Sequence, residues 1–139
     1  MKLLIQRNKQ AFSLIKKLKS FLVKIRVVKS KKGSFGYTSE VFLHQNVLIY
    51  DTTNANQSNK ELSTAFHQLF YSINLYGKTF EQVLIIGFGL GSVVELLQRK
   101  CPIGHVIGIE SNKDIVDCIH KYYILDHIEL LQQDAQTIA

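Results

Sequence analysis

Three glycines at alternate positions are the residues of this sequence best suited to bind a ligand through the backbone. Gly87, Gly89 and Gly91 follow four consecutive apolar residues, Val83–Ile86, and an apolar helical pattern begins at Ser92. Glycine allows positive φ angles and lets a ligand approach the backbone, and the first turn of a helix presents unpaired N–H groups. A buried strand, a glycine turn and a helix in this order predict a cradle for an anionic or nucleotide-like ligand.

Two acidic residues are spaced so that they could lie beside the glycine turn. Glu110 stands nineteen residues after Gly91, at the end of the apolar run His105–Glu110, and Asp134 follows the run Ile128–Gln132. Open α/β sheets bind ligands where the carboxyl ends of their strands meet. We therefore expect Glu110 to accept hydrogen bonds from two ribose hydroxyls and Asp134 to face an adenine amino group. The structural alternatives are a helix-capping role for Glu110 and a solvated turn for Asp134.

The elements that would position these residues alternate between strand and helix. A short helix is predicted over Ser92–Lys100, before Pro102, and a second begins at the capping signal Ser111–Asp114 and reaches about Tyr123. Together with the three apolar runs they give the order β-α-β-α-β. This order predicts an α/β fold with parallel strands joined by right-handed crossovers.

A further helix is predicted before the glycine turn and its strand. Ser58–Glu61 has the spacing of a capping box, and Gly77 suits a C-terminal stop. The apolar residues at helical spacing would form its buried face: Leu62, Ala65, Phe66, Leu69, Phe70, Ile73 and Tyr76.

The basic charge of the chain is concentrated near its N-terminus. The net charge is +6, but residues 1–32 hold eleven Lys and Arg and no acid, whereas residues 33–139 hold six basic and eleven acidic residues. Residues 10–25 have their apolar positions on one helical face, with lysines off that face. We predict a basic amphipathic helix within residues 1–24. It would pack on its own domain or contact nucleic acid or an anionic membrane surface.

The next segment changes to the period of strands. Ile25–Val28, Val41–Leu43 and Asn46–Tyr50 are predicted as strands, and the polar residues 51–59 as a loop. We expect a small antiparallel β-unit of two to four strands over residues 25–57, followed by a cofactor-binding domain over residues 58–139.

Composition limits the class of protein. The 139 residues suffice for one packed domain, and no apolar run is long enough to span a membrane. Met1–Arg7 lacks the apolar region of a secretory signal. Cys101 and Cys118 are the only cysteines, and neither they nor the histidines have metal-ligand spacing. We expect a cytoplasmic protein with reduced thiols and no bound metal.

These motifs resemble the class I S-adenosylmethionine-dependent methyltransferase fold, and within it the spermidine-synthase-like branch. The matching stretches are Val83–Gly91, Val106–Glu110 and Leu131–Ala135, and the β-rich lead-in and the helix with Phe66–Gln68 also look like that branch. The resemblance covers roughly residues 25–139. It implies a Rossmann-like, methyltransferase-type parallel sheet, truncated after three strands and preceded by the basic helix and the β-unit.

The resemblance also implies a cofactor, S-adenosylmethionine or its decarboxylated form, and a small-molecule acceptor. The glycines would line the methionine part of the cofactor, Glu110 would hold its ribose and Asp134 its adenine edge. The cofactor-binding residues are therefore expected to be Gly87, Phe88, Gly89, Gly91, Glu110, Ser111, Asp134 and Ala135.

The sequence departs from spermidine synthases where a substrate would be recognised. Leu90 stands where they carry an acid in the glycine loop, and Phe66–Gln68 where they carry a Tyr-His-Glu-like stretch. Because carboxylates stabilise the ammonium groups of a polyamine, these departures favour methyl transfer over aminopropyl transfer. The family's catalytic loop follows a fourth strand. We therefore expect this chain to lack the catalytic half, to be inactive alone, and to be a truncated product or one part of an assembly, with catalytic residues unknown.

Three other functions stay open at the level of sequence. Gly87, Gly89 and Glu110 would also suit a nicotinamide dinucleotide, although Ser92 stands where that fingerprint has its third glycine. A non-catalytic remnant domain that binds no cofactor could serve as a partner surface. Whichever function holds, the chain could also form a homo-oligomer. The basic N-terminal segment could also bring a methyltransferase to RNA.

Overall fold

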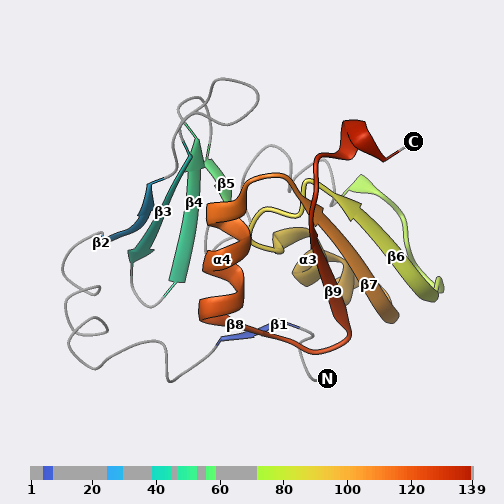
Figure 1. Cartoon of the computed structure of the whole chain (residues 1–139). Helices are drawn as coiled ribbons and strands as arrows, with labels where there is room; N and C mark the ends of the chain where they lie inside the picture. Colours follow the sequence, from blue (N-terminus) through green and yellow to red (C-terminus); the bar gives the residue numbers. More distant parts are fainter. Residues whose placement is uncertain are drawn as a thin grey trace.

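The computed structural model of the chain describes residues 5–7, 25–29, 39–44, 47–52, 56–58 and 72–138 (Figure 1). The strands and helices that it describes are, in chain order, β1 (Ile5–Arg7), β2 (Ile25–Lys29), β3 (Ser39–His44), β4 (Val47–Thr52), β5 (Asn56–Ser58), β6 (Phe80–Ile86), α3 (Ser92–Lys100), β7 (Ile103–Glu110), α4 (Lys113–Tyr122), β8 (Tyr123–Leu125), β9 (Ile128–Gln132) and the 3₁₀ helix η2 (Ala135–Thr137).

A parallel sheet carries the glycine turn. Its strands lie in the order β6-β7-β9, with α3 following β6 and α4 following β7 in the chain. The predicted α/β fold and the β-α-β-α-β order are therefore confirmed, and helix Ser92–Lys100 has the predicted bounds. Figure 1 shows β6 as the outermost strand of this sheet, with β7 and β9 beside it in turn.

Helix α4 is fixed by its cap and by its apolar face. The Asn112 side chain caps the helix by accepting a hydrogen bond from the Asp114 N–H at 3.0 Å, within the predicted capping signal. The buried face includes Ile115 and Ile119, which are fully buried, and the free thiol of Cys118. Cys118 therefore belongs to the core.

The glycine turn is anchored in the core through the side chain between its first two glycines. Phe88 is 2% exposed, and its ring lies over Gly108 in the middle of β7. A Cβ on Gly108 would stand 2.3 Å from Cδ2 of Phe88, so no larger residue fits without displacing the ring. The core cluster continues through residues of α3, α4 and β9, and it includes Val41 of β3.

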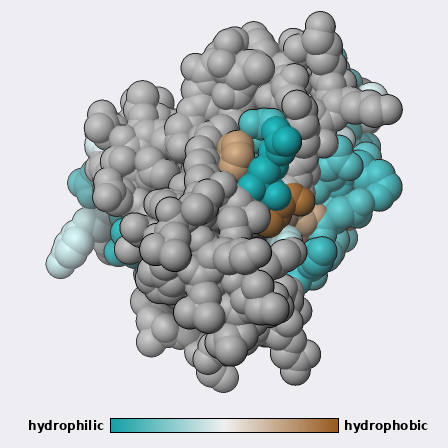
Figure 2. All heavy atoms as spheres, turned by 90° about the vertical axis from the view of Figure 1, so that its left-hand side faces the viewer, coloured by the Kyte–Doolittle hydropathy of each residue, from teal (hydrophilic) through white to brown (hydrophobic). Residues whose placement is uncertain are grey.

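The predicted antiparallel β-unit exists and has four strands, in the order β2-β3-β4-β5. The prediction of a loop over residues 51–59 was wrong in part, because β4 continues to Thr52 and Asn56–Ser58 pairs with β4 as β5. Figure 1 shows α4 between this sheet and the parallel sheet. Figure 2 faces this side of the molecule, where the coloured residues are mostly hydrophilic around a small hydrophobic spot.

Two further predictions need correction. Ile5–Arg7, within the region expected to be a basic helix, forms strand β1, which pairs antiparallel with β8. Residues 73–79 form bends and turns, so the helix predicted before the glycine strand does not reach Ile73 and Tyr76. Both side chains are exposed, by 44% and 93%, and not buried as the helical spacing predicted. The chain leaves the helical path too early for that face to include them.

Residues 10–24, and residues 59–71 of the helix predicted from Ser58, with Phe66–Gln68, lie outside the described residues; Ser58 itself ends strand β5 and does not begin a helix. The division of the chain into three units therefore stays a prediction. Of the helices that the structure describes, neither α3 nor α4 is long and apolar enough to cross a membrane.

We predict that Gly108→Ala destabilises the protein by about 1–3 kcal/mol, the usual cost of forcing extra atoms into a packed core. Urea unfolding followed by circular dichroism measures the change. Because the clash is with the Phe88 ring, Gly108→Ala should destabilise the Phe88→Leu variant by less than it destabilises the wild type. Equal stability of Gly108→Ala and the wild type would contradict the described packing.

We also predict that Cys118 resists alkylation in the folded protein. Burial raises the pKa of its thiol to about 12, so the reactive thiolate is scarce at pH 8. Mass spectrometry after iodoacetamide treatment should find Cys118 unmodified in buffer and modified in guanidinium chloride. Rapid modification in buffer at pH 8 would show that α4 does not bury this side as described.

Candidate functional site

The glycine turn has a backbone shape that glycine adopts freely and other residues rarely adopt. Gly87, Gly89 and Gly91 have φ angles of 74°, 55° and 79°. The N–H groups of Gly87 and Phe88 both donate to the carbonyl of Ile109, at 2.9 Å each, which ties the turn to the end of β7. The spacing of the three glycines is therefore explained by backbone geometry, which a side chain at these positions would strain.

The side chains between the glycines point into the core. Phe88 and Leu90 are 2% and 5% exposed, whereas Gly87 is exposed and open space surrounds the position where a Cβ would stand. Phe88, expected to contact the cofactor, is buried as a whole, and its N–H and C=O are already hydrogen-bonded to Ile109 and Gly91, so the structure does not offer it to a ligand. Of the three glycines, Gly87 is exposed, Gly89 is half-buried and Gly91 is buried, so the accessible backbone of the turn is at its beginning.

Glu110 joins the glycine turn to the beginning of α4. Its Oε2 accepts a hydrogen bond from the Gly89 N–H at 2.9 Å, and its Oε1 accepts one from the Asn112 N–H at 2.9 Å. The residue is 8% exposed, and the positive end of the α4 dipole favours its negative charge. Sequence spacing predicted that Glu110 would lie beside the turn, and the structure places the two in direct contact.

The carboxylate keeps capacity for a ligand. A carboxylate offers about four acceptor positions, and the hydrogen bonds from Gly89 and Asn112 use two. Because both bonded donors are backbone groups, no side-chain motif in the sequence indicates them. Only Glu110 itself could be found by sequence reasoning.

Asp134 lies at the same edge of the sheet but serves a local purpose. Its Oδ1 accepts a hydrogen bond from the Gln136 N–H at 3.0 Å, which makes it the N-cap of η2. The neighbouring Gln133 N–H donates to the Glu110 carbonyl at 3.1 Å, so β9 and β7 stay joined up to this point. Ser111 is exposed and Ala135 is half-buried. Within residues 72–138, no hydrogen bond joins the Asp134 side chain to the glycine turn.

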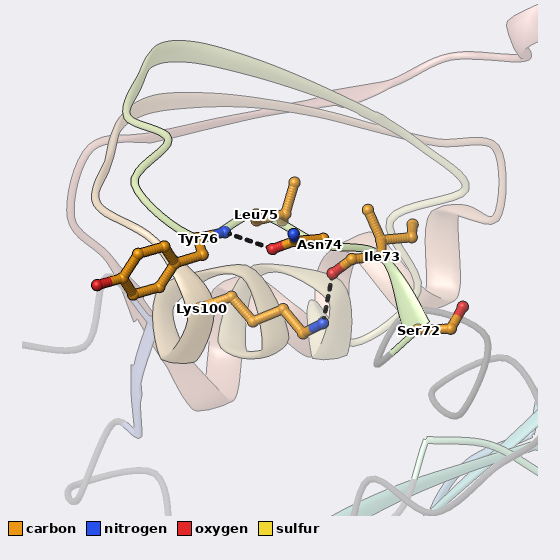
Figure 3. Close-up of a pocket in the computed structure, with 6 residues that line it drawn as sticks. All are labelled: Ser72, Ile73, Asn74, Leu75, Tyr76 and Lys100. Carbon is orange, nitrogen blue, oxygen red and sulfur yellow. Dashed lines mark hydrogen bonds between the residues drawn. The ribbon is translucent and has the colours of Figure 1, made fainter.

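A second hollow, which sequence reasoning missed, lies at the other end of α3. A cavity of about 370 Å³ is lined by residues 72–76 and Lys100. Figure 3 shows the Lys100 side chain reaching toward Ile73, whose carbonyl accepts a hydrogen bond from Nζ at 2.7 Å. Lys100 is the last residue of α3, whereas the glycine turn precedes the first, so the cavity and the turn lie at opposite ends of this helix. Within the described residues, no group of three His, Cys, Asp or Glu residues could hold a metal ion.

Comparisons with known proteins place the fold and leave the activity open. No family model and no curated protein matches the sequence. Two solved structures are similar: spermidine synthase from Thermotoga maritima, with a TM-score of 0.54 and 13% identity over 79% of this chain, and a spermidine synthase in complex with the transition-state analogue AdoDATO, with 0.54 and 13% over 77%. The aligned parts are 42% and 40% of those chains, so this chain spans less than half the length of either. The predicted Rossmann-like, spermidine-synthase-like fold is confirmed as a fold.

We predict that Glu110→Ala loosens the glycine turn. It removes the acceptor of two partly buried backbone N–H groups, which should cost about 1–2 kcal/mol of stability and speed amide exchange at Gly89 and Asn112. Urea unfolding and hydrogen-exchange mass spectrometry measure the two effects. Glu81→Ala, an exposed acid in β6, is the matched control and should leave both unchanged. Unaltered exchange at Gly89 in Glu110→Ala would show that the carboxylate does not hold the turn.

Proposed function

We propose that this chain forms the adenosyl-binding part of a transferase that uses S-adenosylmethionine or its decarboxylated form. The observation that carries the proposal is a buried carboxylate, Glu110, fixed against a positive-φ glycine turn at the carboxyl end of two parallel strands. Open α/β sheets bind nucleotide-like ligands at this place. The likeness to spermidine synthases, one of them solved with AdoDATO, supports the same choice.

The residues present fit such a cofactor. Glu110 keeps acceptor positions for the two ribose hydroxyls, and the open space at Gly87 lets the methionine part approach the backbone. Asp134 and Ala135 stand two to three residues beyond β9 and would flank the adenine edge, and Ser111 would flank the ribose. When bound, the sulfonium supplies the electrophilic carbon, and this chain's residues supply alignment.

Methyl transfer fits the site better than aminopropyl transfer. Leu90, which stands where spermidine synthases carry an acid, is 5% exposed and belongs to the core. The turn therefore offers no carboxylate of its own to a polyamine ammonium group. The acceptor would be a small molecule of another kind. Because the chain spans less than half of its structural neighbours, the complete transfer reaction is part of the proposal.

Calorimetric titration tests the proposal with S-adenosylhomocysteine and NAD in separate experiments. We expect S-adenosylhomocysteine to bind and NAD to bind at least about tenfold more weakly, a difference of about 1.4 kcal/mol. Glu110→Gln should weaken S-adenosylhomocysteine by a similar factor because it loses charged acceptors for the ribose, whereas Glu81→Gln should not. Thermal melts show whether each variant is folded at the titration temperature.

Two other results of these titrations would contradict the proposal. Binding of NAD alone would replace the transferase with a nicotinamide dinucleotide-binding protein. Binding of neither ligand by the folded chain would overturn the proposal and leave a domain that acts as a partner surface.

A further inference from the structure

The two oxygens of the Glu110 carboxylate are held by different parts of the chain. Oε2 accepts its hydrogen bond from Gly89 in the glycine turn, and Oε1 accepts its bond from the N–H of Asn112, the N-cap of α4. The last torsion of a glutamate side chain, which rotates the carboxylate plane, is soft. A bond to one oxygen alone would leave this rotation open, whereas one bond to each oxygen restrains it. The N–H of Asn112 therefore helps to set the direction in which the remaining acceptor positions of Glu110 point.

Asn112 is itself held by the first turn of α4. Its Oδ1 accepts a hydrogen bond from the Asp114 N–H at 3.0 Å. Its carbonyl accepts hydrogen bonds from the N–H groups of Ile115 and Val116, at 3.0 and 3.1 Å. Ile115 is fully buried and Val116 is 6% exposed, so this turn of the helix is anchored in the core. The position of the N–H that holds Glu110 is therefore set by the packing of α4.

A ligand with two adjacent hydroxyls makes a specific demand on this carboxylate. In the proposed function Glu110 accepts hydrogen bonds from both ribose hydroxyls, which requires a defined orientation of the carboxylate plane. Paired hydrogen bonds to a charged group gain geometric specificity as well as energy. A carboxylate that is already oriented in the free protein does not have to be ordered when the ligand binds. Such preorganisation raises affinity because it lowers the cost of binding.

We propose that Asn112 is a positioning residue for the ribose of the adenosyl ligand. Its backbone N–H, placed by α4, holds the Glu110 carboxylate in the orientation that accepts the two hydroxyls. This inference rests on the proposed function and adds to it the group that orients Glu110. The sequence marks Asn112 only as part of a helix-capping signal, because the positioning group is its N–H and not its side chain.

Two substitutions at residue 112 separate the N–H from the side-chain cap. Asn112→Pro removes both, whereas Asn112→Ala removes only the cap and is the matched control. The φ angle of Asn112, −82°, lies close to the range of proline. Calorimetric titration of the full chain with S-adenosylhomocysteine and with its 2′,3′-dideoxy analogue measures the preference for ribose hydroxyls in each variant. Circular dichroism shows whether each variant is folded.

The N–H of Asn112 should affect one ligand and not the other. We expect the wild type to bind S-adenosylhomocysteine at least about tenfold more tightly than the dideoxy analogue, because hydrogen bonds to a charged group are lost in the analogue. In Asn112→Pro this preference should fall at least about fivefold, with the affinity for the analogue changed less than about twofold. Asn112→Ala should keep the wild-type preference within about twofold, although the lost cap makes it less stable. A merely structural role of residue 112 would weaken both ligands alike.

Amide hydrogen exchange followed by NMR supplies a second measurement, which does not depend on the folding of a variant. If Asn112 holds Glu110 while the ribose is bound, saturating S-adenosylhomocysteine should slow exchange of the Asn112 N–H more than the saturating dideoxy analogue does. Equal or faster exchange overturns the proposal, and faster exchange would show that Glu110 releases Asn112 to reach the ribose.

The titrations distinguish failure of this inference from failure of the proposed function. A wild type that binds both ligands equally, or a folded Asn112→Pro that keeps the full preference, overturns the positioning role while binding of S-adenosylhomocysteine still supports the proposed function. A folded wild type that binds neither ligand overturns the proposed function and this inference with it.

Discussion

The hydrogen bonds of the Glu110 carboxylate are the interaction on which the site depends. One oxygen accepts from the Gly89 N–H in the turn after β6, and the other accepts from the Asn112 N–H at the beginning of α4. A single buried side chain therefore fixes the relative position of two strand ends and the helix that follows the second. Charged hydrogen bonds to backbone donors are among the stronger ones in proteins. The same carboxylate keeps acceptor positions, so the group that orders the site could also accept hydrogen bonds from a ligand.

The packing beneath the turn explains how a glycine-rich segment keeps one shape. Glycine loses more conformational freedom on folding than any other residue, so three glycines in five positions are costly unless the chain between them is held. Phe88 and Leu90 provide that hold, because both are buried and Phe88 covers Gly108. Gly108, although it lies in another strand, therefore helps to fix the turn, because its lack of a side chain makes room for the Phe88 ring. The close fit leaves only Gly87 of the turn fully exposed.

The parallel sheet is unequal at its two edges and on its two faces. Helices and the antiparallel sheet build one core on one side, into which Val41 of β3 is also packed. On the other face the apolar residues of β6 stay exposed at the outer edge. Among the described strands, β6, which delivers the glycine turn, is thus also an edge strand of the parallel sheet.

The sequence by itself determined the central elements and tertiary structure decided the rest. The period of apolar residues, the cap at Asn112 and the spacing of Glu110 are local signals, and α3, α4 and the three parallel strands follow them. The pairing of β1 with β8, and of β5 with β4, joins short polar or mixed segments whose partners give no local signal. The exposure of Ile73 and Tyr76 likewise depends on where the chain leaves the helical path. Glu110 was found because strand ends in a parallel sheet must converge, whereas its partners are backbone N–H groups, which every residue but proline carries and which only the folded chain can select.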